Sequence, residues 1–278
     1  MSGKRLLVER GSERLAERRR LRRRRVCVAF VILLLLLLAT AVWGLWQSQL
    51  RISHVQIFGL PPDRQAQAAE YVTQAMQGSY GNAIPRDSIL FFSATRIRND
   101  LLAAHPEIAA VSIFRKGLTG LSIKIDTRVP VARWCGLAPT KGVEEYCYFF
   151  DAKGYIFAAA ATTTQTINPF MVYAPLVGET LEPLRATMVN ADKLPSAFDF
   201  ARQLATFGSP VERIIFRGEE VDDLLVSGAR VTYLLGDEQN AFTALVSARE
   251  NFNLADGSID YVDLRFGSKV YVKKKSGI

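Results

Sequence analysis

Apolar and polar residues alternate along residues 261–272, near the end of the chain. The apolar series is Val262, Leu264, Phe266, Ser268, Val270 and Val272, and the polar series is Tyr261, Asp263, Arg265, Gly267, Lys269 and Tyr271. A period of two predicts one β-strand with a single face against the core. A strand placed last in a chain often lies at a sheet edge, where a row of N–H and C=O groups has no neighbour.

Residues 51–128 combine strand-like and helix-like patterns. Residues 61–78 have apolar residues at helical spacing between an initial proline and a final glycine. Residues 93–106 predict a second helix, with Ser93 as its N-cap. One alternating segment precedes these helices, and two more follow them around a glycine-containing turn. The predicted order is β-α-α-β-β, which packs two helices on one side of a small sheet.

The chain from residue 129 to 272 is predicted to be mainly β. The predicted strands cover residues 129–135, 145–151, 155–160, 211–217, 223–227 and 230–236, before the closing strand at 261–272. Amphipathic patterns predict helices over residues 195–208 and 240–252. The expected fold class is therefore α+β: an apolar N-terminal helix, a β-α-α-β-β domain, and a mainly antiparallel β domain with flanking helices.

An uncharged run of 21 residues, 26–46, is long enough to cross a bilayer. At about 1.5 Å per residue it spans a hydrocarbon core of roughly 30 Å. Residues 1–25 hold eleven Lys and Arg and three Glu, which accounts for the whole net charge of +8. Basic flanks stay on the cytoplasmic side, so we expect the tail inside and residues 47–278 outside. The run "RRRLRRRR" is therefore interpreted as a topology signal and not as a nucleic-acid-binding arm.

A cleaved signal peptide is the alternative interpretation of this apolar run. Ala39, Thr40 and Ala41 have the small-x-small pattern of a cleavage site. The run continues past Ala41, however, and the basic region before it is long. We therefore expect an uncleaved anchor, in a single-pass protein of the inner membrane whose N-terminus is cytoplasmic.

The cysteines fit an extracytoplasmic location. Cys27 lies in the apolar run and is expected to be an apolar filler. Cys135 and Cys147 lie in the part expected outside, where disulfides persist. The two are symmetric about residue 141, so a hairpin centred there would place them opposite each other, within disulfide range. We predict a possible disulfide between them, with two free, buried thiols as the alternative.

Residues with catalytic potential are few. The only histidines, His54 and His105, are far apart in sequence, and no His/Cys cluster has metal-ligand spacing. The sequence lacks G-x-S-x-G and S-x-x-K motifs, so no nucleophile is marked. Paired acids occur in "GEEVDD" at residues 218–223, and two carboxylates are what glycoside hydrolysis uses. A charged turn between strands is the favoured interpretation, and we expect no enzyme activity, cofactor, metal or small-molecule substrate.

A series of short stretches resembles the FtsQ/DivIB family of bacterial cell-division proteins. In order they are "HVQIFGL", "HPEIAAVSIFR", "LSIKIDTRVPVARW", "FDAKGYIF", "PLVG" and "YVDLRF", preceded by the basic tail and the single anchor. The resemblance covers nearly the whole chain, and "YVDLRF" is its most telling element. It implies that residues 51–128 form a POTRA domain and that residues 129–272 form a β domain ending in a partner-binding strand. The cysteine pair and the basic end of the chain, including residues 273–278, depart from the family pattern.

The resemblance implies a non-catalytic, membrane-anchored scaffold at the division septum. Such scaffolds bind FtsB/DivIC-like and FtsL-like proteins through the C-terminal strand, and an FtsK-like upstream component through the POTRA domain or the anchor. The expected partner-binding residues are Tyr261, Asp263, Arg265, Phe266, Gly267, Ser268 and Val270. We expect Arg265 to bond to a partner carboxylate. The resemblance suggests an aromatic contact at Phe266, whereas simple alternation points that ring inward.

Two other classes of protein remain open from the sequence. One is a membrane-anchored cell-wall hydrolase, and the other is a POTRA-type factor of outer-membrane assembly. The second class would require several POTRA units or a long alternating barrel, and the sequence has neither pattern.

Overall fold

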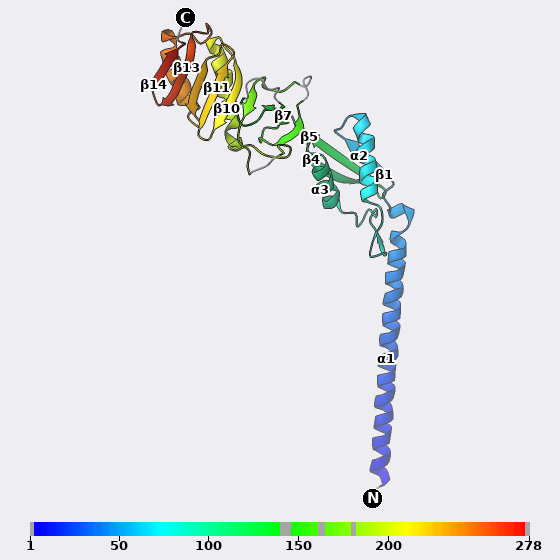
Figure 1. Cartoon of the computed structure of the whole chain (residues 1–278). Helices are drawn as coiled ribbons and strands as arrows, with labels where there is room; N and C mark the ends of the chain where they lie inside the picture. Colours follow the sequence, from blue (N-terminus) through cyan, green and yellow to red (C-terminus); the bar gives the residue numbers. More distant parts are fainter. Residues whose placement is uncertain (1–2, 140–145, 161–164, 179–181, 276–278) are drawn as a thin grey trace. The chain divides into compact units, whose positions relative to one another are not determined.

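The computed structural model describes residues 3–139, 146–160, 165–178 and 182–275, with side chains from residue 20 onward. These residues divide into two compact units. The first unit holds the chain up to Leu101 together with Val111–Ile125, and the second holds Leu102–Ala110 and the chain from Asp126. Figure 1 labels the elements in chain order. The fold is α+β, as predicted, and each unit is described by itself.

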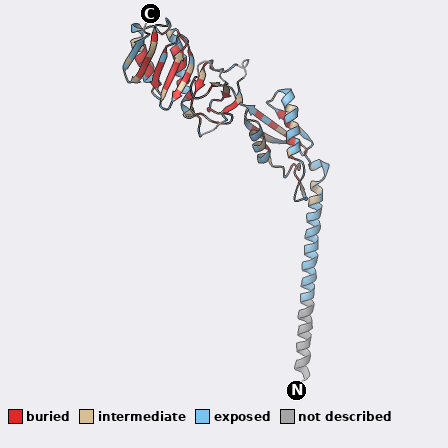
Figure 2. Cartoon of the chain, viewed as in Figure 1, coloured by how far each residue is buried: buried red, intermediate tan, exposed pale blue. Residues whose placement is uncertain are grey.

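Helix α1 (Gly3–Leu45) contains the predicted anchor. Among the described residues, its part from Arg20 to Leu45 is the one helix long and apolar enough to cross a membrane. None of this span is buried within the protein, and Figure 2 colours it as exposed except near its C-terminal end, where it is intermediate. The part of this span after Arg25 is uncharged and exposes its leucines, which is stable in hydrocarbon and costly in water. The span is therefore consistent with the expected membrane anchor.

The first unit continues with the elements predicted for residues 51–128. After a 3-10 turn (η1, Ser48–Leu50) they are β1 (His54–Phe58), α2 (Pro62–Ala75), α3 (Ala94–Ala104), β4 (Ile108–Lys116) and β5 (Gly120–Thr127). A short hairpin that the sequence did not predict, β2 (Ser79–Tyr80) with β3 (Ile84–Pro85), lies between the two helices. The three longer strands form a sheet in the order β1-β5-β4, with β1 parallel to β5.

Local residues explain these boundaries. Pro62 is the first residue of α2, where its missing N–H costs nothing. The backbone N–H of Arg96 donates to the Ser93 Oγ at 3.3 Å, so Ser93 caps α3 as predicted. Gly59, with φ of 93°, lets the chain leave β1 directly against β5. A Cβ there would lie 1.9 Å from the Ile125 carbonyl oxygen.

The second unit is built on a nine-stranded sheet with the order β14-β13-β12-β11-β10-β9-β6-β7-β8. Its strands are β6 (Ala132–Trp134), β7 (Tyr148–Phe150), β8 (Ile156–Ala159), β9 (Met171–Tyr173), β10 (Val211–Arg217), β11 (Glu220–Leu225), β12 (Arg230–Leu234), β13 (Ile259–Phe266) and β14 (Lys269–Lys274). Its helices are α4 (Leu194–Leu204) and α5 (Glu238–Ala248), with 3-10 turns η2 (Ala191–Lys193), η3 (Ala205–Phe207) and η4 (Arg249–Asn251).

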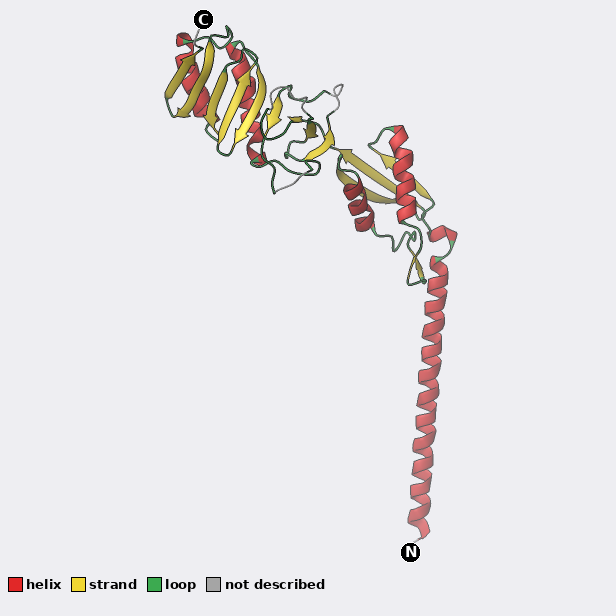
Figure 3. Ribbon diagram, viewed as in Figure 1, coloured by secondary structure: helices red, strands yellow, loops and turns green. Residues whose placement is uncertain are grey.

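This sheet is mixed, because β9 is parallel to both β6 and β10 and β12 is parallel to β13. Parallel neighbours need a crossover connection, which α4 provides between β9 and β10 and α5 provides between β12 and β13. Figure 3 shows both helices on the same side of the sheet. Their apolar faces and the inward residues of the strands form one core, in which the Phe200 and Tyr233 rings lie 4.3 Å apart. Among the residues that the structure describes, no helix of the second unit covers the opposite face of strands β10 to β14, which is called the helix-free face below (Figure 3).

Cys135 and Cys147 form a disulfide, as their spacing predicted. Strands β6 and β7 are antiparallel, with Trp134 opposite Tyr148 and Ala132 opposite Phe150. This register is centred on residue 141, so the next pair outward is the two cysteines, whose Cα atoms are 4.2 Å apart. The tip of this hairpin, residues 140–145, lies outside the described residues.

Candidate functional site

The segment predicted as one closing strand is a hairpin. Strand β13 ends at Phe266, Gly267 and Ser268 form the turn, and β14 returns from Lys269. Gly267 has φ of 63°, the positive region that two-residue hairpin turns require. Because of a register shift between Asp263 and Phe266, Tyr261 to Asp263 pair with Lys273 to Tyr271, so odd-numbered residues are opposite odd-numbered ones and even-numbered residues opposite even-numbered ones. Apart from Phe266, residues of β14 therefore continue the alternation of β13, which is why the sequence pattern indicated a single strand.

The hairpin changes which edge is open. Strand β13 pairs with β12 on one side and with β14 on the other, so both of its edges are occupied. The expected contact residues Tyr261, Asp263 and Arg265 thus lie on an interior strand, and Ser268 lies in a turn. Among the described strands of this sheet, β14 and β8 are the two at its ends. The open edge near the C-terminus is therefore β14, whose last residues had been assigned to a basic tail.

The inward face predicted from alternation is correct for Val262, Leu264 and Val270 but not for Phe266, the last residue of β13. Val262 and Leu264 are buried, and Val270 is partly buried against the core. Phe266 is 55% exposed, and its ring packs edge-to-face on Tyr271 at 5.3 Å between centroids. Because the register shift precedes it, Phe266 leaves the inward series. The ring lies on the surface, where the resemblance had placed an aromatic contact.

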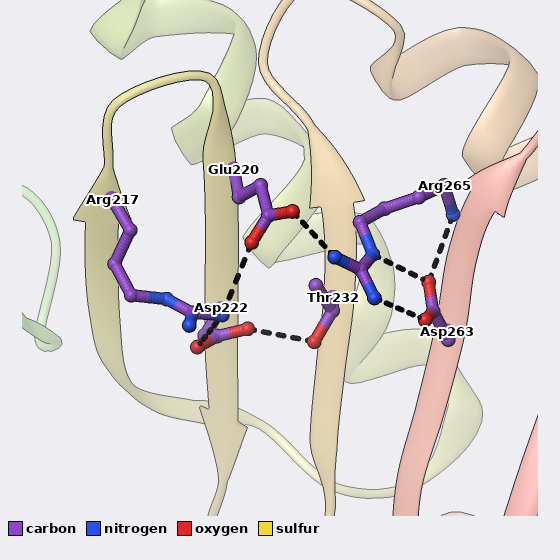
Figure 4. Close-up of polar contacts among 6 residues, drawn as sticks. All are labelled: Arg217, Glu220, Asp222, Thr232, Asp263 and Arg265. Atoms are coloured by element: carbon purple, nitrogen blue, oxygen red, sulfur yellow. Dashed lines mark hydrogen bonds and ion pairs between the residues drawn. The ribbon is translucent and has the colours of Figure 1, made fainter.

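Arg265 is the centre of a polar network on the helix-free face. Its Nε donates to Asp263 Oδ1 at 2.9 Å, and its Nη2 donates to Asp263 Oδ2 at 2.6 Å. Its Nη1 reaches across β12 to the Glu220 carboxylate on β11. Figure 4 shows this guanidinium bridging the two acids. The hydrogen bonds from Arg265 lower the pKa of Asp263, against the opposing effect of its burial.

The same network continues toward β10. Glu220 also lies 3.6 Å from the Arg217 Nη2, which pairs with Asp222 Oδ2 at 2.7 Å. The Thr232 hydroxyl donates to Asp222 Oδ1 at 2.7 Å (Figure 4). Arg217 and Arg265 thus pair with three carboxylates, and the network extends over the four strands β10 to β13. Because these carboxylates outnumber the arginines, a further carboxylate near Arg265 competes with acids already present.

Beside this network lies a basic and aromatic row. Tyr261 is opposite Arg230 on β12 and Lys273 on β14. The Arg230 guanidinium and the Lys273 ammonium lie 5.5 and 5.6 Å from the centre of the Tyr261 ring, within cation–π range. Lys273 also pairs with Asp260 at 3.1 Å. Tyr261 therefore sits half-buried between two cations.

The acidic stretch "GEEVDD" does not form the predicted turn. Only Gly218 and Glu219 lie between strands, and Glu220 begins β11. Neighbouring residues of a strand point to opposite faces, so Asp222 joins the polar network while Asp223 enters the core. The Asp223 carboxyl oxygens and the Tyr233 hydroxyl are buried without a hydrogen-bond partner among the described residues. Burial, followed by repulsion from Asp222 and Glu238, raises the pKa of Asp223 well above its usual range.

The described residues contain no group of three or more His, Cys, Asp or Glu placed to hold a metal ion. His105 lies 3.3 Å from Glu107, and His54 is on β1. Sequence reasoning missed the roles of Arg217, Glu220, Asp222 and Thr232. Their contacts depend on which strands are neighbours, and no motif in the sequence encodes that register.

Comparison with known proteins adds no name to this site. No protein-family model matches the chain, and no curated protein matches it. The class of protein that the fold defines is an α+β protein with a sheet-rich unit and one helix apolar enough to span a membrane.

Proposed function

We propose that this chain is a membrane-anchored scaffold of the bacterial division machinery, of the FtsQ/DivIB type, and that β14 receives a strand from a partner. The observation that carries the proposal is the open edge of β14 at the end of a nine-stranded sheet. An extended segment that adds to such an edge gains main-chain hydrogen bonds, while its side chains provide selectivity. The partners proposed are FtsB/DivIC-like and FtsL-like proteins.

The edge offers enough binding free energy for a tethered partner. Roughly five ladder bonds at about 1 kcal/mol each come close to the cost of ordering the incoming segment. One or two buried apolar side chains, at about 2 kcal/mol each, make the balance favourable. Tethering both proteins in one membrane raises their effective concentration, so a modest intrinsic affinity is sufficient. The apolar span of α1 supports such tethering.

Arg265 keeps a role in this proposal, although Asp263 and Glu220 already bind it. A guanidinium has five N–H groups, and the contacts to these two acids account for three of them. The remaining N–H groups are proposed to donate to a partner carbonyl or, in competition with Asp263 and Glu220, to a partner carboxylate. Exposed Phe266 and Tyr271 provide an aromatic surface on the same hairpin.

The first unit is proposed to be a POTRA domain that recruits an FtsK-like upstream component, with α1 as a second possible contact. The element order of β1 through β5 supports this proposal, and the added hairpin of β2 and β3 is a local elaboration. We further propose that α1 leaves the N-terminus in the cytoplasm and that the protein is enriched at the septum.

No observation favours the two alternatives over this proposal. The acids of "GEEVDD" do not gather at one point, because Asp222 and Asp223 lie on opposite faces of β11 and Glu220 and Asp222 are bound to arginines. The described residues contain one unit with the β-α-α-β-β order, whereas outer-membrane assembly factors would need several.

Adjacent prolines in β14 test the edge. Successive N–H groups of a strand point to opposite edges, so of Tyr271→Pro and Val272→Pro one removes a bond to β13 and the other removes a bond offered to a partner. We expect one variant to lose the hairpin and the other to stay folded but to lose co-purification with FtsB/DivIC-like and FtsL-like proteins. A folded variant that retains wild-type co-purification would contradict the proposal. A fluorescent fusion of the full chain should gather at midcell, and uniform membrane fluorescence would count against a division role.

A further inference from the structure

The open edge of β14 is unusually basic. The strand "KVYVKK" carries Lys269, Lys273 and Lys274 and no acid, and Lys275 follows it. Lys269 and Lys273 share the helix-free face with Tyr271 between them, because residues of the same parity lie on one side of a strand. The two valines, Val270 and Val272, lie on the other side.

These lysines are only partly neutralised by the chain itself. Lys273 pairs with Asp260, yet its side chain is still 56% exposed. Lys269 is exposed and makes no ion pair among the residues that the structure describes. Beyond Lys273 in the same row lies Arg230, stacked on Tyr261. The helix-free face beside the edge therefore favours negative charge on any segment that adds to it.

The helix side of the hairpin offers a different surface. Asn240, Thr243, Ala244 and Ser247 recur at helical spacing on one face of α5, and together with Gly267 and Ser268 they line a groove of about 360 Å³. All of these side chains are small. They leave space beside the turn that precedes β14, on the helix side of the hairpin, where an apolar side chain of an added strand could enter.

We infer that the segment that adds to β14 is an acidic protein strand of alternating character. Carboxylates at its first and fifth positions lie opposite Lys269 and Lys273, and apolar residues at its second and fourth positions lie opposite Val270 and Val272. The third position faces Tyr271. Opposite charges placed across neighbouring strands stabilise pairing, and like charges oppose it. This inference rests on the proposed function, because it specifies the chemistry of the strand that the edge receives.

Lysines on an edge also prevent one sheet from pairing with another. That role needs only charges of one sign on β14 and sets no requirement on a partner. Complementarity, in contrast, predicts that reversing the charge of the edge reverses the charge of the preferred partner. The two explanations therefore differ in a measurable way.

A displayed peptide library makes that measurement. Yeast would display the pattern X-Val-X-Val-X, with Glu, Gln and Lys in equal amounts at each X. It would be sorted with the full chain in lipid nanodiscs held on streptavidin tetramers. We expect Glu to be enriched over Lys by about tenfold when the first and fifth positions are considered together. The Lys269→Glu/Lys273→Glu variant should reverse this preference, and Lys269→Gln/Lys273→Gln should abolish it. Lys153→Glu, a single Lys-to-Glu exchange and so half the charge change, lies in a turn of the same unit and should leave the preference unaltered.

The outcomes distinguish the acidic character of the partner from the addition of a strand to β14. Enrichment of the valine pattern without any preference for charge would overturn the acidic partner while leaving edge addition intact. A Glu preference that survives both double variants at Lys269 and Lys273 would also overturn it, because the carboxylates would then bind elsewhere. The absence of any enrichment over nanodiscs lacking the protein would overturn edge addition itself, and the inference with it.

Discussion

Removing the Arg265 side chain is the most direct test of the polar network on β10 to β13. Arg265 is the cation that Asp263 and Glu220 share. The Asp263 side chain is only 12% exposed, so water replaces the lost contacts poorly. We expect Arg265→Ala to destabilise the second unit by leaving a nearly buried carboxylate without its main partner.

The magnitude follows from the contacts. Hydrogen bonds to charged groups contribute about 1.5–3 kcal/mol in mutational studies. The Glu220 side chain is 34% exposed, so its pairing is screened by solvent and adds little. We therefore expect a loss of about 2–3 kcal/mol. At roughly 2–4 °C per kcal/mol for a unit of this size, the Tm falls by roughly 5–10 °C.

The pH dependence of this loss has a definite sign. Arg265 holds the pKa of Asp263 below its usual range. A carboxyl with a lowered folded-state pKa stabilises the protein above the unfolded-state pKa of about 3.9, and this contribution disappears as pH falls through the folded-state pKa. The difference between wild type and Arg265→Ala should therefore be full at pH 7 and should shrink below about pH 4.

Calorimetry of the full chain in detergent micelles at pH 7 and pH 3 measures both effects. Arg249→Ala is the matched control, because Arg249 is exposed and makes no ion pair among the described residues. Its effect should stay within about 0.5 kcal/mol. A Tm for Arg265→Ala equal to that of wild type at pH 7, or a difference that is as large at pH 3, would refute the reasoning.

Two further predictions concern stability. Asp223→Asn should raise the stability of the second unit at pH 7 by on the order of 1 kcal/mol. Burial raises the pKa of Asp223, so the folded protein loses stability as pH rises from about 3.9 toward the raised pKa, and asparagine removes this loss. Thermal scans should show the gain vanishing near pH 4, and an equal gain at pH 4 and pH 7 would exclude a titration effect. Cys135→Ser/Cys147→Ser should cost about 3 kcal/mol by the chain-entropy estimate for a cross-link 12 residues apart. Its Tm should match that of reduced wild type, and a variant as stable as the oxidised protein would show that the cross-link does not stabilise the fold.

Much of the architecture was predictable because it depends on local patterns. The helix that follows Ser93 required only an N-cap and periodic apolar residues, and both are visible in the sequence. The disulfide required only symmetry about one hairpin, since β6 and β7 follow each other directly. The short pair of β2 and β3 was missed because two residues per strand are too few to establish a period.

Other features depend on contacts that are distant in sequence. The interaction of Arg265 with Glu220 spans 45 residues and requires β12 to lie between their strands. Nothing in either local sequence specifies that order. Asp223 illustrates a different difficulty, because a charged residue predicts exposure, yet the alternation of β11 places it in the core opposite Ile214 and Val231.

The hairpin explains why the edge and the network belong to different strands. Strand β13 is secured on both sides and contributes Val262 and Leu264 to the core, so it holds Asp263 and Arg265 in fixed positions. Strand β14 has one neighbour and is exposed along nearly its whole length. Its order therefore depends mainly on the ladder with β13, because it buries little apolar surface of its own. A strand added outside β14 would supply the second ladder and cover the valines, so binding and the ordering of β14 would reinforce each other.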